Sequence, residues 1–366
     1  MSIDSRSRSA IIAPLEARVS CCPNPVHCIL PPYLLDKLAE SPDPTVRKLA
    51  IEAIARSAAL RAARTTMTRF HAVAAPASAS RGKERVIFDM KQQGSTFLPG
   101  KLMRREGDPK STDSAVNEAY DHSGVTYDFY KKLFSRNSLD DRGMALVSSV
   151  HLGRNYNNAF WNGEQMAYGD GDGVIFIRFT KSLDVVGHEL SHGVVSNTCN
   201  LDYKNEPGAL NEHFADVFGS LIKQWKKKHS AAKADWLIGP DIMGPGTSAK
   251  ALRTFKAGLA YEDDPNLGTD PQPKHLAHKY TGTADSGGVH INSGIPNHAF
   301  FLVATALGGN AWDKAGRIWY QTLLALNQRS DFAHMVAMTT QSAAALFGHA
   351  STEEQVVSNA WKAVGF

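Results

Sequence analysis

His188-Glu189-Leu190-Ser191-His192 is the stretch of sequence from which the organisation of this chain can be worked out. It lies in a segment, 182–196, whose apolar residues recur at helical spacing. Residues four positions apart project from the same face of an α-helix, so His188 and His192 are expected to lie side by side. Two imidazoles arranged in this way can bind one zinc ion. Glu189 is adjacent to that face and is expected to reach water at the metal without binding the metal itself.

The same five residues could instead be two surface histidines on an amphipathic helix with an unrelated glutamate. The next predicted helix, at 209–226, argues against this interpretation, because Glu212 follows His192 at a distance that allows a loop and an antiparallel return. Glu212 and Asp216 are again four residues apart and share a helix face. We interpret Glu212 as the third zinc ligand, which leaves the fourth tetrahedral position for water. Asp216 is interpreted as the acceptor for the second N–H of a ligating histidine.

This set of ligands indicates hydrolysis of a peptide bond. Zinc lowers the pKa of its water, and Glu189 is expected to take the proton as general base and pass it to the leaving amine. The oxyanion that forms needs hydrogen-bond donors. Tyr203 and His290 are candidates for these donors, and Asp285 can orient the imidazole of His290.

Composition and charge exclude several other classes of protein. The 366 residues are 43% hydrophobic and 21% charged, which is typical of a globular protein with a sizeable core and room for two domains. No stretch approaches the roughly 20 apolar residues of a membrane helix. Residues 1–75 contain ten Lys/Arg and six Asp/Glu and account for the net charge of +4, whereas residues 76–366 contain thirty of each. A folded body without excess positive charge is not typical of a nucleic-acid binder. We therefore expect neither nucleic acid nor a membrane as partner.

The cysteines and the N-terminal residues bear on the cellular compartment. Four cysteines are too few for a disulfide scaffold, and three of them lie in the first thirty residues. The first residues carry positive charge without the apolar region of a secretory signal peptide. We expect synthesis in the cytoplasm, with secretion by a leaderless route left open.

The chain divides into a strand-rich first half and a helical second half. Asp43-Pro44 offers an N-cap and a first helical proline for an amphipathic helix at about 45–69. A stretch of Ala, Ser and Pro at 72–82 reads as an exposed linker, and composition and charge both change there. Strands are predicted at 85–90, 147–153 and 174–179, a loop or edge at 155–163, and helices at 182–196, 209–226, 296–307, 311–327, 332–347 and 353–364.

These motifs and their surroundings resemble the thermolysin-like (M4) zinc metallopeptidases. The resemblance covers most of residues 85–366. It implies an α+β fold with a strand-rich lobe at 76–200 that ends in the central zinc-binding helix, and a helical lobe at 201–366. It also implies a zinc endopeptidase that acts on proteins and peptides, expected to be a monomer with one catalytic zinc ion. The segments that carry the resemblance are 157–163, 168–173, 184–192, 208–212 and 287–294.

The resemblance supports the roles given above to the zinc ligands, Glu189, Asp216, Tyr203, His290 and Asp285, and it adds residues for substrate binding. Asn158 and the backbone of Ala159 resemble the clamp for the peptide backbone, and Arg253 resembles the arginine that binds a substrate carbonyl. Six apolar residues match the pocket for the residue after the scissile bond, so cleavage before Leu, Ile, Phe or similar residues is expected. They are Phe176, Phe179, Val185, Ile238, Ile242 and Leu252.

The chain departs from relatives that bind a double calcium site. Those relatives use several carboxylates near the second helix. Asp184 and Asp235 are present here, but Lys223, Leu237 and Pro240 stand at other carboxylate positions. An ammonium at Lys223 would repel a cation and could pair with Asp184. We expect no double calcium site.

The N-terminal region, with Pro31-Pro32-Tyr33, resembles the protealysin subgroup, whose precursors have a short inhibitory prosegment with a Pro-Pro motif. Residues 1–75 are therefore expected to be a prosegment that lies in the active site and is removed near 74–82 by the enzyme itself. A disordered Pro-rich tail is the alternative. A further variant has the Cys28 thiolate at the open position of zinc.

Two other classes of function stay open at this point. A catalytically silent relative would be a zinc-stabilised binding module, but it would have no need for Glu189 beside the open position. An exopeptidase would need a charged anchor for a substrate terminus, and none of the motifs clearly supplies one.

Overall fold

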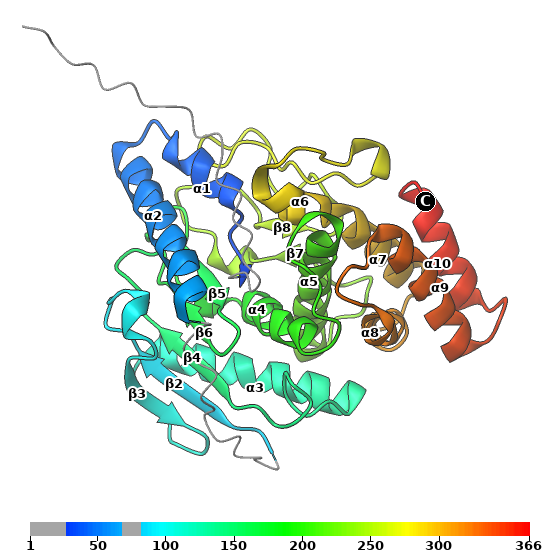
Figure 1. Ribbon diagram of the computed structural model, residues 1–366, viewed down its shortest axis with the longest axis horizontal. Helices are drawn as coiled ribbons and strands as arrows, with labels where there is room; N and C mark the ends of the chain where they lie inside the picture. Colours follow the sequence, from blue (N-terminus) through cyan, green and yellow to red (C-terminus); the bar gives the residue numbers. More distant parts are fainter. Residues whose placement is uncertain (1–26, 68–81) are drawn as a thin grey trace, which may run out of the picture.

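The computed structural model describes residues 27–67 and 82–366, and for residues 59–67 only the helical backbone. Cys21, Cys22 and nearly all of the predicted cleavage region, 74–82, lie outside these residues. The described chain has a sheet-containing lobe, a helical lobe and a pair of N-terminal helices that lies against both (Figure 1).

The first lobe is built on a six-stranded mixed sheet with the strand order β1-β5-β6-β4-β2-β3. The central pairs β6–β4 and β4–β2 are parallel, and the other three pairs are antiparallel. Helix α3 (Ser114–Phe134), which begins after an N-cap at Asp113, packs between β2 and β4 of this sheet and helix α4. The strands are β1 (His27–Cys28), β2 (Arg85–Asp89), β3 (Lys101–Arg105), β4 (Leu146–Val150), β5 (Ala159–Trp161) and β6 (Met166–Tyr168).

Two buried helices form the centre of the molecule. Helix α4 (Leu183–Ser196) is buried from Leu183 to Val195, and α5 (Asn205–Lys227) is buried from Gly208 to Gln224. A helix that is buried on every side lies in a core rather than at its surface. The two helices approach closely because Gly187 and Gly219 face each other: a Cβ on Gly219 would lie 2.6 Å from the carbonyl oxygen of Asp184. This contact places the His188 turn of α4 against α5.

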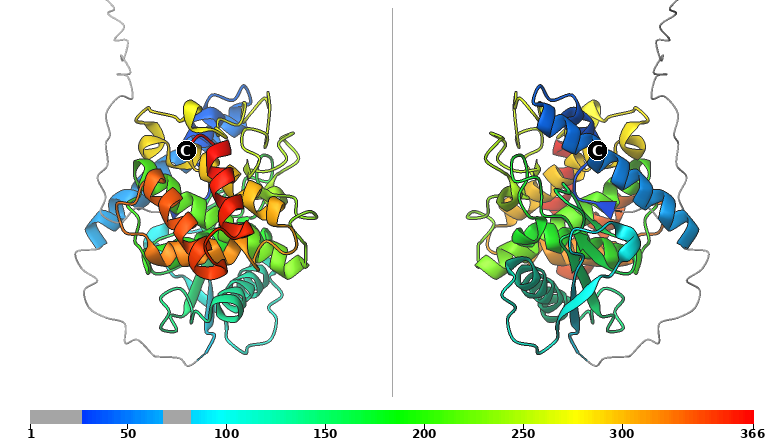
Figure 2. Two further views of the ribbon diagram at one scale, coloured as in Figure 1. Left: turned by 90° about the vertical axis from the view of Figure 1, so that its right-hand side faces the viewer. Right: turned by 90° about the vertical axis from the view of Figure 1, so that its left-hand side faces the viewer.

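The second lobe is a group of helices that packs against α5 on the side away from the six-stranded sheet (Figure 2). The helical predictions for the C-terminal half are confirmed, with ends displaced by a few residues. A two-stranded sheet of β7 (Leu237–Ile238) and β8 (Arg253–Thr254) precedes them. The helices are α6 (Ala284–Asn292), α7 (Gly294–Leu307), α8 (Ala315–Ala325), α9 (Phe332–Phe347) and α10 (Thr352–Ala363).

Helices α1 (Pro32–Ala39) and α2 (Pro44–Met67) pack across both lobes. Asp43 accepts hydrogen bonds from the amides of the first turn of α2, as its position before Pro44 predicts. Ser57 on α2 lies within hydrogen-bond distance of Tyr156 in the first lobe, and Ser41 donates to Asn266 in the second. Residues 27–58 are therefore docked on the body, and the alternative of a disordered tail is wrong for this part of the chain.

The prediction of a strand at 174–179 is wrong. Asp172 accepts hydrogen bonds from three successive amides at 174–176, which turns the backbone away from an extended course. Phe176 makes only an isolated bridge with Met243, and a 3-10 helix, η2 (Phe179–Lys181), follows. Ile175, Phe176 and Phe179 are buried in the core instead of in the sheet, whereas Val174 is exposed.

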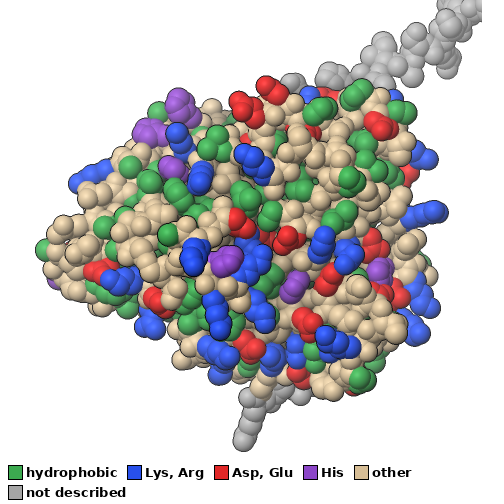
Figure 3. Space-filling model, turned by 180° about the vertical axis from the view of Figure 1, so that it is seen from behind, with side chains coloured by type: hydrophobic (Ala, Val, Ile, Leu, Met, Phe, Trp, Pro, Cys, Tyr) green, Lys and Arg blue, Asp and Glu red, His purple; other side chains and the backbone are tan. Residues whose placement is uncertain are grey.

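The surface bears on the predicted partners. Among the described residues, no helix is both long and apolar enough to span a membrane. On the face seen in Figure 3, acidic and basic side chains are interspersed rather than separated into fields of one sign.

Candidate active site

Helices α4 and α5 bring the three predicted zinc ligands together. Nε2 of His188 lies 3.0 Å from Nε2 of His192 and 3.6 Å from Oε2 of Glu212. Oε1 of Glu212 lies 3.4 Å from Nε2 of His192. Ligand atoms about 2.0–2.2 Å from a tetrahedral zinc ion are separated by roughly 3.4 Å. The spacing of the three side chains therefore matches one zinc ion.

The hydrogen bonds around these side chains show why the donors fit a cation. Nδ1 of His188 lies 2.8 Å from Asp216, and Nδ1 of His192 lies 2.8 Å from the side-chain oxygen of Asn211. Each Nδ1 faces an oxygen acceptor and carries the ring proton, so each Nε2 presents a lone pair. Two lone pairs this close repel each other in a buried site unless a cation lies between them. Oε2 of Glu212 is buried and has no hydrogen-bond partner among the described residues. Two imidazoles and a carboxylate are a ligand set that zinc prefers.

Asp216 connects the histidine to the arginine predicted to bind substrate. Besides its 2.8 Å contact with Nδ1 of His188, Asp216 accepts hydrogen bonds from Arg253 at Nε and Nη2 and from Asn297. Burial opposes its ionisation, but Arg253 and His188 outweigh burial and hold the pKa of Asp216 well below its usual range. An ionised Asp216 fixes the ring of His188 in the orientation that directs Nε2 at the metal position.

Glu189 follows His188 on α4 and is completely buried. The amide of Trp161 on β5 donates to Oε2 of Glu189 at 3.0 Å, which ties the carboxylate to the sheet. Burial, and then the charge of Glu212, raise the pKa of Glu189 well above its usual value, whereas the amides of Trp161 and Ile29 oppose this rise.

Tyr203 and His290 approach the centre from the helical lobe. The hydroxyl of Tyr203 donates to Glu212 and lies 3.1 Å from Nε2 of His290. Residues 285–288 have positive φ angles, and this left-handed turn lets Asp285 accept from the backbone amide of His290 at 2.8 Å and contact Nδ1 at 2.6 Å. Burial lowers the pKa of His290, but Glu212 and Asp285 outweigh it and raise the pKa to about 9. The structure thus brings all three predicted residues together.

The first described residues enter this site as an extended strand. β1 pairs antiparallel with β5, so that His27 lies opposite Trp161. Past β1, the amide of Ile29 donates to the carbonyl oxygen of Ala159 at 3.2 Å, and the amide of Leu30 donates to Oδ1 of Asn158 at 3.1 Å. Asn158 and Ala159, predicted to bind a peptide backbone, bind the backbone of the chain's own N-terminal segment.

Two carbonyl groups of this strand meet predicted catalytic and binding residues. The carbonyl oxygen of Cys28 lies 3.1 Å from Nε2 of His290. The next carbonyl oxygen, that of Ile29, accepts a hydrogen bond from Nη1 of Arg253 at 2.9 Å. The Cys28–Ile29 peptide bond therefore lies between the groups that the sequence assigns to oxyanion stabilisation and substrate binding.

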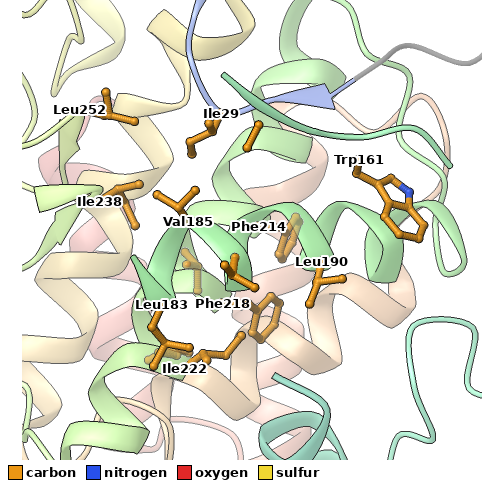
Figure 4. Close-up of a cluster of buried hydrophobic side chains, with 14 of the residues drawn as sticks. Ile29, Trp161, Leu183, Val185, Leu190, Phe214, Phe218, Ile222, Ile238 and Leu252 are labelled. Atoms are coloured by element: carbon orange, nitrogen blue, oxygen red, sulfur yellow. The ribbon is translucent and has the colours of Figure 1, made fainter. Parts of the chain in front are cut away.

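The side chain of Ile29 is completely buried in the hydrophobic core of the molecule. Figure 4 shows it beside Leu252, Ile238 and Val185. The other three residues of the predicted pocket, Phe176, Phe179 and Ile242, belong to the same buried cluster.

The Pro-Pro motif lies just beyond this strand. Pro31 is buried in an extended conformation with φ of −59° and ψ of 144°, and Pro32 is the first residue of α1. Tyr33 is partly buried and packs against the core. The two prolines change the backbone from a strand to a helix, because proline suits both an extended segment and the first helical position.

Lys223 on α5 is paired with two carboxylates. Its ammonium group donates to Asp184 at 2.7 Å, to Asp235 and to the carbonyl oxygen of Leu237. The side chain is 3% exposed, so its charge is neutralised within the protein. The predicted pairing of Lys223 with Asp184 is confirmed.

Sequence reasoning missed two residues near the metal position. Asn211 falls within the segment 208–212, and its place one residue before Glu212, on a helix that faces His192, is the signal that could identify it as a partner for that histidine. His27 gives no such signal, because a single histidine before Cys28 has no spacing relationship to the ligands on α4 and α5. Its ring stacks on that of His192, with 4.3 Å between the ring centroids.

Comparison with known proteins identifies the class to which this chain belongs. Residues 71–196 match the family model described as the thermolysin metallopeptidase catalytic domain, and residues 199–366 match that of its alpha-helical domain. A protein named extracellular metalloprotease from Pectobacterium carotovorum subsp. carotovorum is 45% identical over 344 residues, which are 93% of this chain and 96% of the relative. Protease PrtS from Photorhabdus sp. (strain Az29) is 48% identical over 77% of this chain and 76% of its own length. The protein is a metalloendopeptidase.

It belongs to the thermolysin-like (M4) family, and within that family it is protealysin-like. The solved structure of the precursor of protealysin, a metalloproteinase from Serratia proteamaculans, is 46% identical and superimposes with a TM-score of 0.83. That match covers 93% of this chain and 99% of the other chain. The fold of the whole molecule, with its strand-rich lobe and its helical lobe, is therefore the thermolysin-like fold that the sequence predicts.

Proposed function

We propose that this chain is the self-processing zymogen of a zinc endopeptidase that cleaves peptide bonds on the N-terminal side of hydrophobic residues. The observation that carries the proposal is the position of the Cys28–Ile29 bond. Its carbonyl oxygen faces His290, its amide pairs with Ala159, and the side chain after the bond is buried among apolar residues. A substrate bound in the same direction would present its own peptide bond and its own hydrophobic residue to the same groups.

We assign the chemistry to this chain's residues as follows. Zinc, when bound by His188, His192 and Glu212, supplies a Lewis acid that polarises the carbonyl and activates water. Glu189, held by the amide of Trp161, takes a proton and gives it to the leaving amine. Tyr203 and His290, which Asp285 orients, donate to the carbonyl oxygen as it gains negative charge. The substrate backbone after the scissile bond is held by Asn158, Ala159 and Arg253, and its side chain by the six residues of the apolar pocket.

The proposed division of the chain follows from this function. Residues 1–75 are the inhibitory prosegment, 76–200 the strand-rich lobe with the zinc-binding helix, and 201–366 the helical lobe. The segment 27–58 blocks the site because it uses the same hydrogen bonds that a substrate needs. Removal of the prosegment near 74–82 frees those groups, and the enzyme itself makes the cut.

A catalytically silent binding module is less well supported. Glu189 is a fully buried carboxylate whose desolvation is costly. A binding module would gain nothing from placing that charge beside the open side of the ligand set.

We further propose that the stability of this chain does not depend on calcium. The Lys223 ammonium group lies between Asp184 and Asp235, where a divalent cation would otherwise be neutralised. Adding calcium or a calcium-selective chelator is expected to shift the unfolding temperature by less than about 1 °C. A shift of several degrees would contradict this proposal, because in a chain of this length it corresponds to a stability change of more than about 1 kcal/mol.

Protein and peptide substrates follow from the metalloendopeptidase class, and we propose that the active form is a monomer that acts outside the cell. The Pectobacterium relative is named an extracellular metalloprotease, which supports export. Immunodetection of the mature form in the culture medium, with a cytoplasmic marker as a control for lysis, tests this localisation.

The experiment that tests the zymogen proposal follows the purified full-length chain over time by intact-mass spectrometry, with and without a zinc chelator. Hydrolysis of two matched peptides, one with Leu and one with Asp after the scissile bond, is measured in parallel. We expect a loss of about 70 to 80 residues and a rise in cleavage of the Leu peptide, both blocked by the chelator. A chain that is fully active before any shortening, or that shortens equally with the chelator, would refute the proposal.

A further inference from the structure

His27 lies at the metal position although it comes from the N-terminal segment and not from the helices that hold the ligands. It is the first residue of β1 and is 4% exposed. Its ring stacks on His192 at 4.3 Å with an interplanar angle of 18°, and it meets the edge of the Tyr203 ring at 4.5 Å. The pairing of β1 with β5 fixes the backbone of His27 opposite Trp161, so this placement is determined by the sheet.

The nitrogen of His27 is within reach of the proposed zinc ion. Ligand atoms of His27, His192 and Glu212 all lie within 4.8 Å of one another. Atoms bound to one tetrahedral zinc ion at about 2.0–2.2 Å are roughly 3.4 Å apart, and the metal lies in the plane of each imidazole that binds it. To bind the ion, the His27 ring therefore has to rotate out of its stack on His192. His188 does not belong to that group of three, but its Nε2 lies 3.0 Å from that of His192 and 3.6 Å from Oε2 of Glu212.

We propose that His27 is the fourth zinc ligand in the precursor and that it fills the coordination position needed for water. This inference rests on the proposed function of the chain as a zinc peptidase zymogen. In the precursor, zinc is then bound by three imidazoles and one carboxylate. When the prosegment leaves, His27 leaves with it and the fourth position opens.

The ligation explains why a substrate-like segment can persist in the site. The Cys28–Ile29 bond is held by His290 and Arg253 through its neighbouring carbonyl groups, as a bond about to be cleaved would be. Hydrolysis also requires water at the metal. An imidazole in that position excludes water, so the segment is aligned but not cleaved.

His27 is a better candidate for this ligand than Cys28. Successive side chains of a strand point to opposite faces, so both residues cannot face the metal from β1. The group of ligand atoms identified in the described residues includes His27 and does not include Cys28. An imidazole also adds no negative charge to a site that already holds Glu212 beside the buried Glu189.

The test uses the full-length chain with the substitution Glu189→Gln, which blocks self-processing while leaving the zinc ligands in place. Four proteins are compared: this parent and the parent with His27→Phe, Cys28→Ser or Ile51→Phe added. Phenylalanine keeps the flat ring that stacks on His192 but has no ligand atom. Ile51→Phe is the control, because Ile51 is an exposed residue of α2, far from β1 in sequence.

Two measurements do not depend on activity. The visible absorption spectrum of the cobalt-substituted proteins reports the ligands of the metal, and transfer of zinc to a competing chelator reports how tightly it is held. We expect His27→Phe to change the spectrum and to weaken zinc binding about tenfold or more, a loss of at least 1.4 kcal/mol. Cys28→Ser and Ile51→Phe should leave both unchanged. Equal spectra and equal zinc retention in the parent and His27→Phe would overturn the inference and leave only a stacking role for His27. A change confined to Cys28→Ser would overturn it in favour of the thiolate.

A third measurement needs no substitution at His27 and covers the case in which that variant does not fold. X-ray absorption spectroscopy of the zinc-loaded parent counts the imidazole ligands. We expect three in the precursor and two in the matured wild-type enzyme; two in both would overturn the inference. If the parent bound no stoichiometric zinc at all, the proposed function itself would fail, so the two failures are distinguishable.

Discussion

The carbonyl oxygen of Cys28 lies 3.1 Å from Nε2 of His290, a residue 262 positions further along the chain. This contact fixes the direction in which the N-terminal segment lies in the site. Together with the bond from Arg253 to Ile29, it places the segment in the same sense as a substrate, with Ile29 after the aligned bond. Inhibition by the prosegment and recognition of substrates are therefore expected to depend on the same residues.

Replacing Glu189 by Gln is expected to abolish cleavage of peptides and of the chain itself, because the amide cannot accept the proton. The loss should be at least about 100-fold, the usual contribution of a general base. Zinc content should stay near one ion per chain, since Glu189 is not among the three ligands. Intact mass, zinc content and peptide hydrolysis check this together. A Glu189→Gln chain that matured at the normal rate would show that another residue is the base.

Replacing Ile29 by Lys is expected to release the precursor from inhibition. The Ile29 side chain is completely buried, and burying it contributes about 1.5–3 kcal/mol. An ammonium in the same apolar surroundings would be strongly unfavourable. Peptide hydrolysis in the first minutes after purification, before the chain has shortened, should rise at least about tenfold.

The matched control for this change is Ile51→Lys. Ile51 belongs to α2 and its side chain is 54% exposed, so the substitution adds the same charge to the N-terminal region without entering the site. Its precursor should stay as latent as the wild type. If Ile29→Lys were equally latent, Ile29 would not be the residue that occupies the specificity pocket.

Much of the site follows from local rules. Helical spacing places His188 beside His192 and Glu212 beside Asp216, and both helices form where the apolar pattern predicts them. What local spacing does not contain is the contact between the two helices, which depends on the close approach at Gly219. Glu212 can be assigned as a ligand from the sequence only because two histidines on one helix and a carboxylate on the next together make a zinc site.

The parts that sequence reasoning missed depend on long-range pairing. His27 reaches the metal position because β1 adds to the edge of β5, and no periodicity connects residues 27 and 161. Residues 174–179 have the composition of a strand, but Asp172 accepts hydrogen bonds from the amides of 174–176 and so turns the backbone out of an extended course. The helix α3 was not predicted, although Asp113 caps it.

Replacing Gly219 by Ala is expected to weaken zinc binding without touching a ligand. A Cβ at this position would lie 2.6 Å from the carbonyl oxygen of Asp184 and 3.0 Å from the backbone nitrogen of His188. The backbone of α4 cannot give way as a flexible side chain could, so α5 should move and carry Glu212 away from the histidines. Overpacking of this kind costs about 1–3 kcal/mol in stability.

Urea unfolding and zinc competition with a chelator measure both effects in chains that also contain Glu189→Gln. Gly94→Ala is the control, because a Cβ there meets no atom within 4 Å. Equal zinc retention in the two variants would show that the helix contact does not set the geometry of the metal site.

Stability is expected to fall at alkaline pH through His151, which belongs to the strand-rich lobe and is not one of the zinc ligands. Its two ring nitrogens contact Asp170 and Asp113, each at 2.8 Å. The hydrogen bond to Asp170 is the largest influence, and with Asp113 it outweighs burial and raises the pKa of His151 from its ordinary value to about 9. A raised pKa means that the folded protein holds this proton more tightly than the unfolded chain. The stabilisation is therefore fully present below pH 6.5 and is lost as the pH rises through about 9. Because the side chain is 23% exposed, we expect this stabilisation to be about 1–3 kcal/mol.

The free energy of unfolding is measured in urea at pH 6 and pH 10 in chains that also contain Glu189→Gln. It should fall more between the two pH values in the parent than in the chain with His151→Asn added. Asparagine suits the positive φ of 55° at this position. The control His349→Asn changes an exposed histidine and should follow the parent. If the parent and His151→Asn lost the same amount of stability, the two carboxylates would not hold a proton on His151.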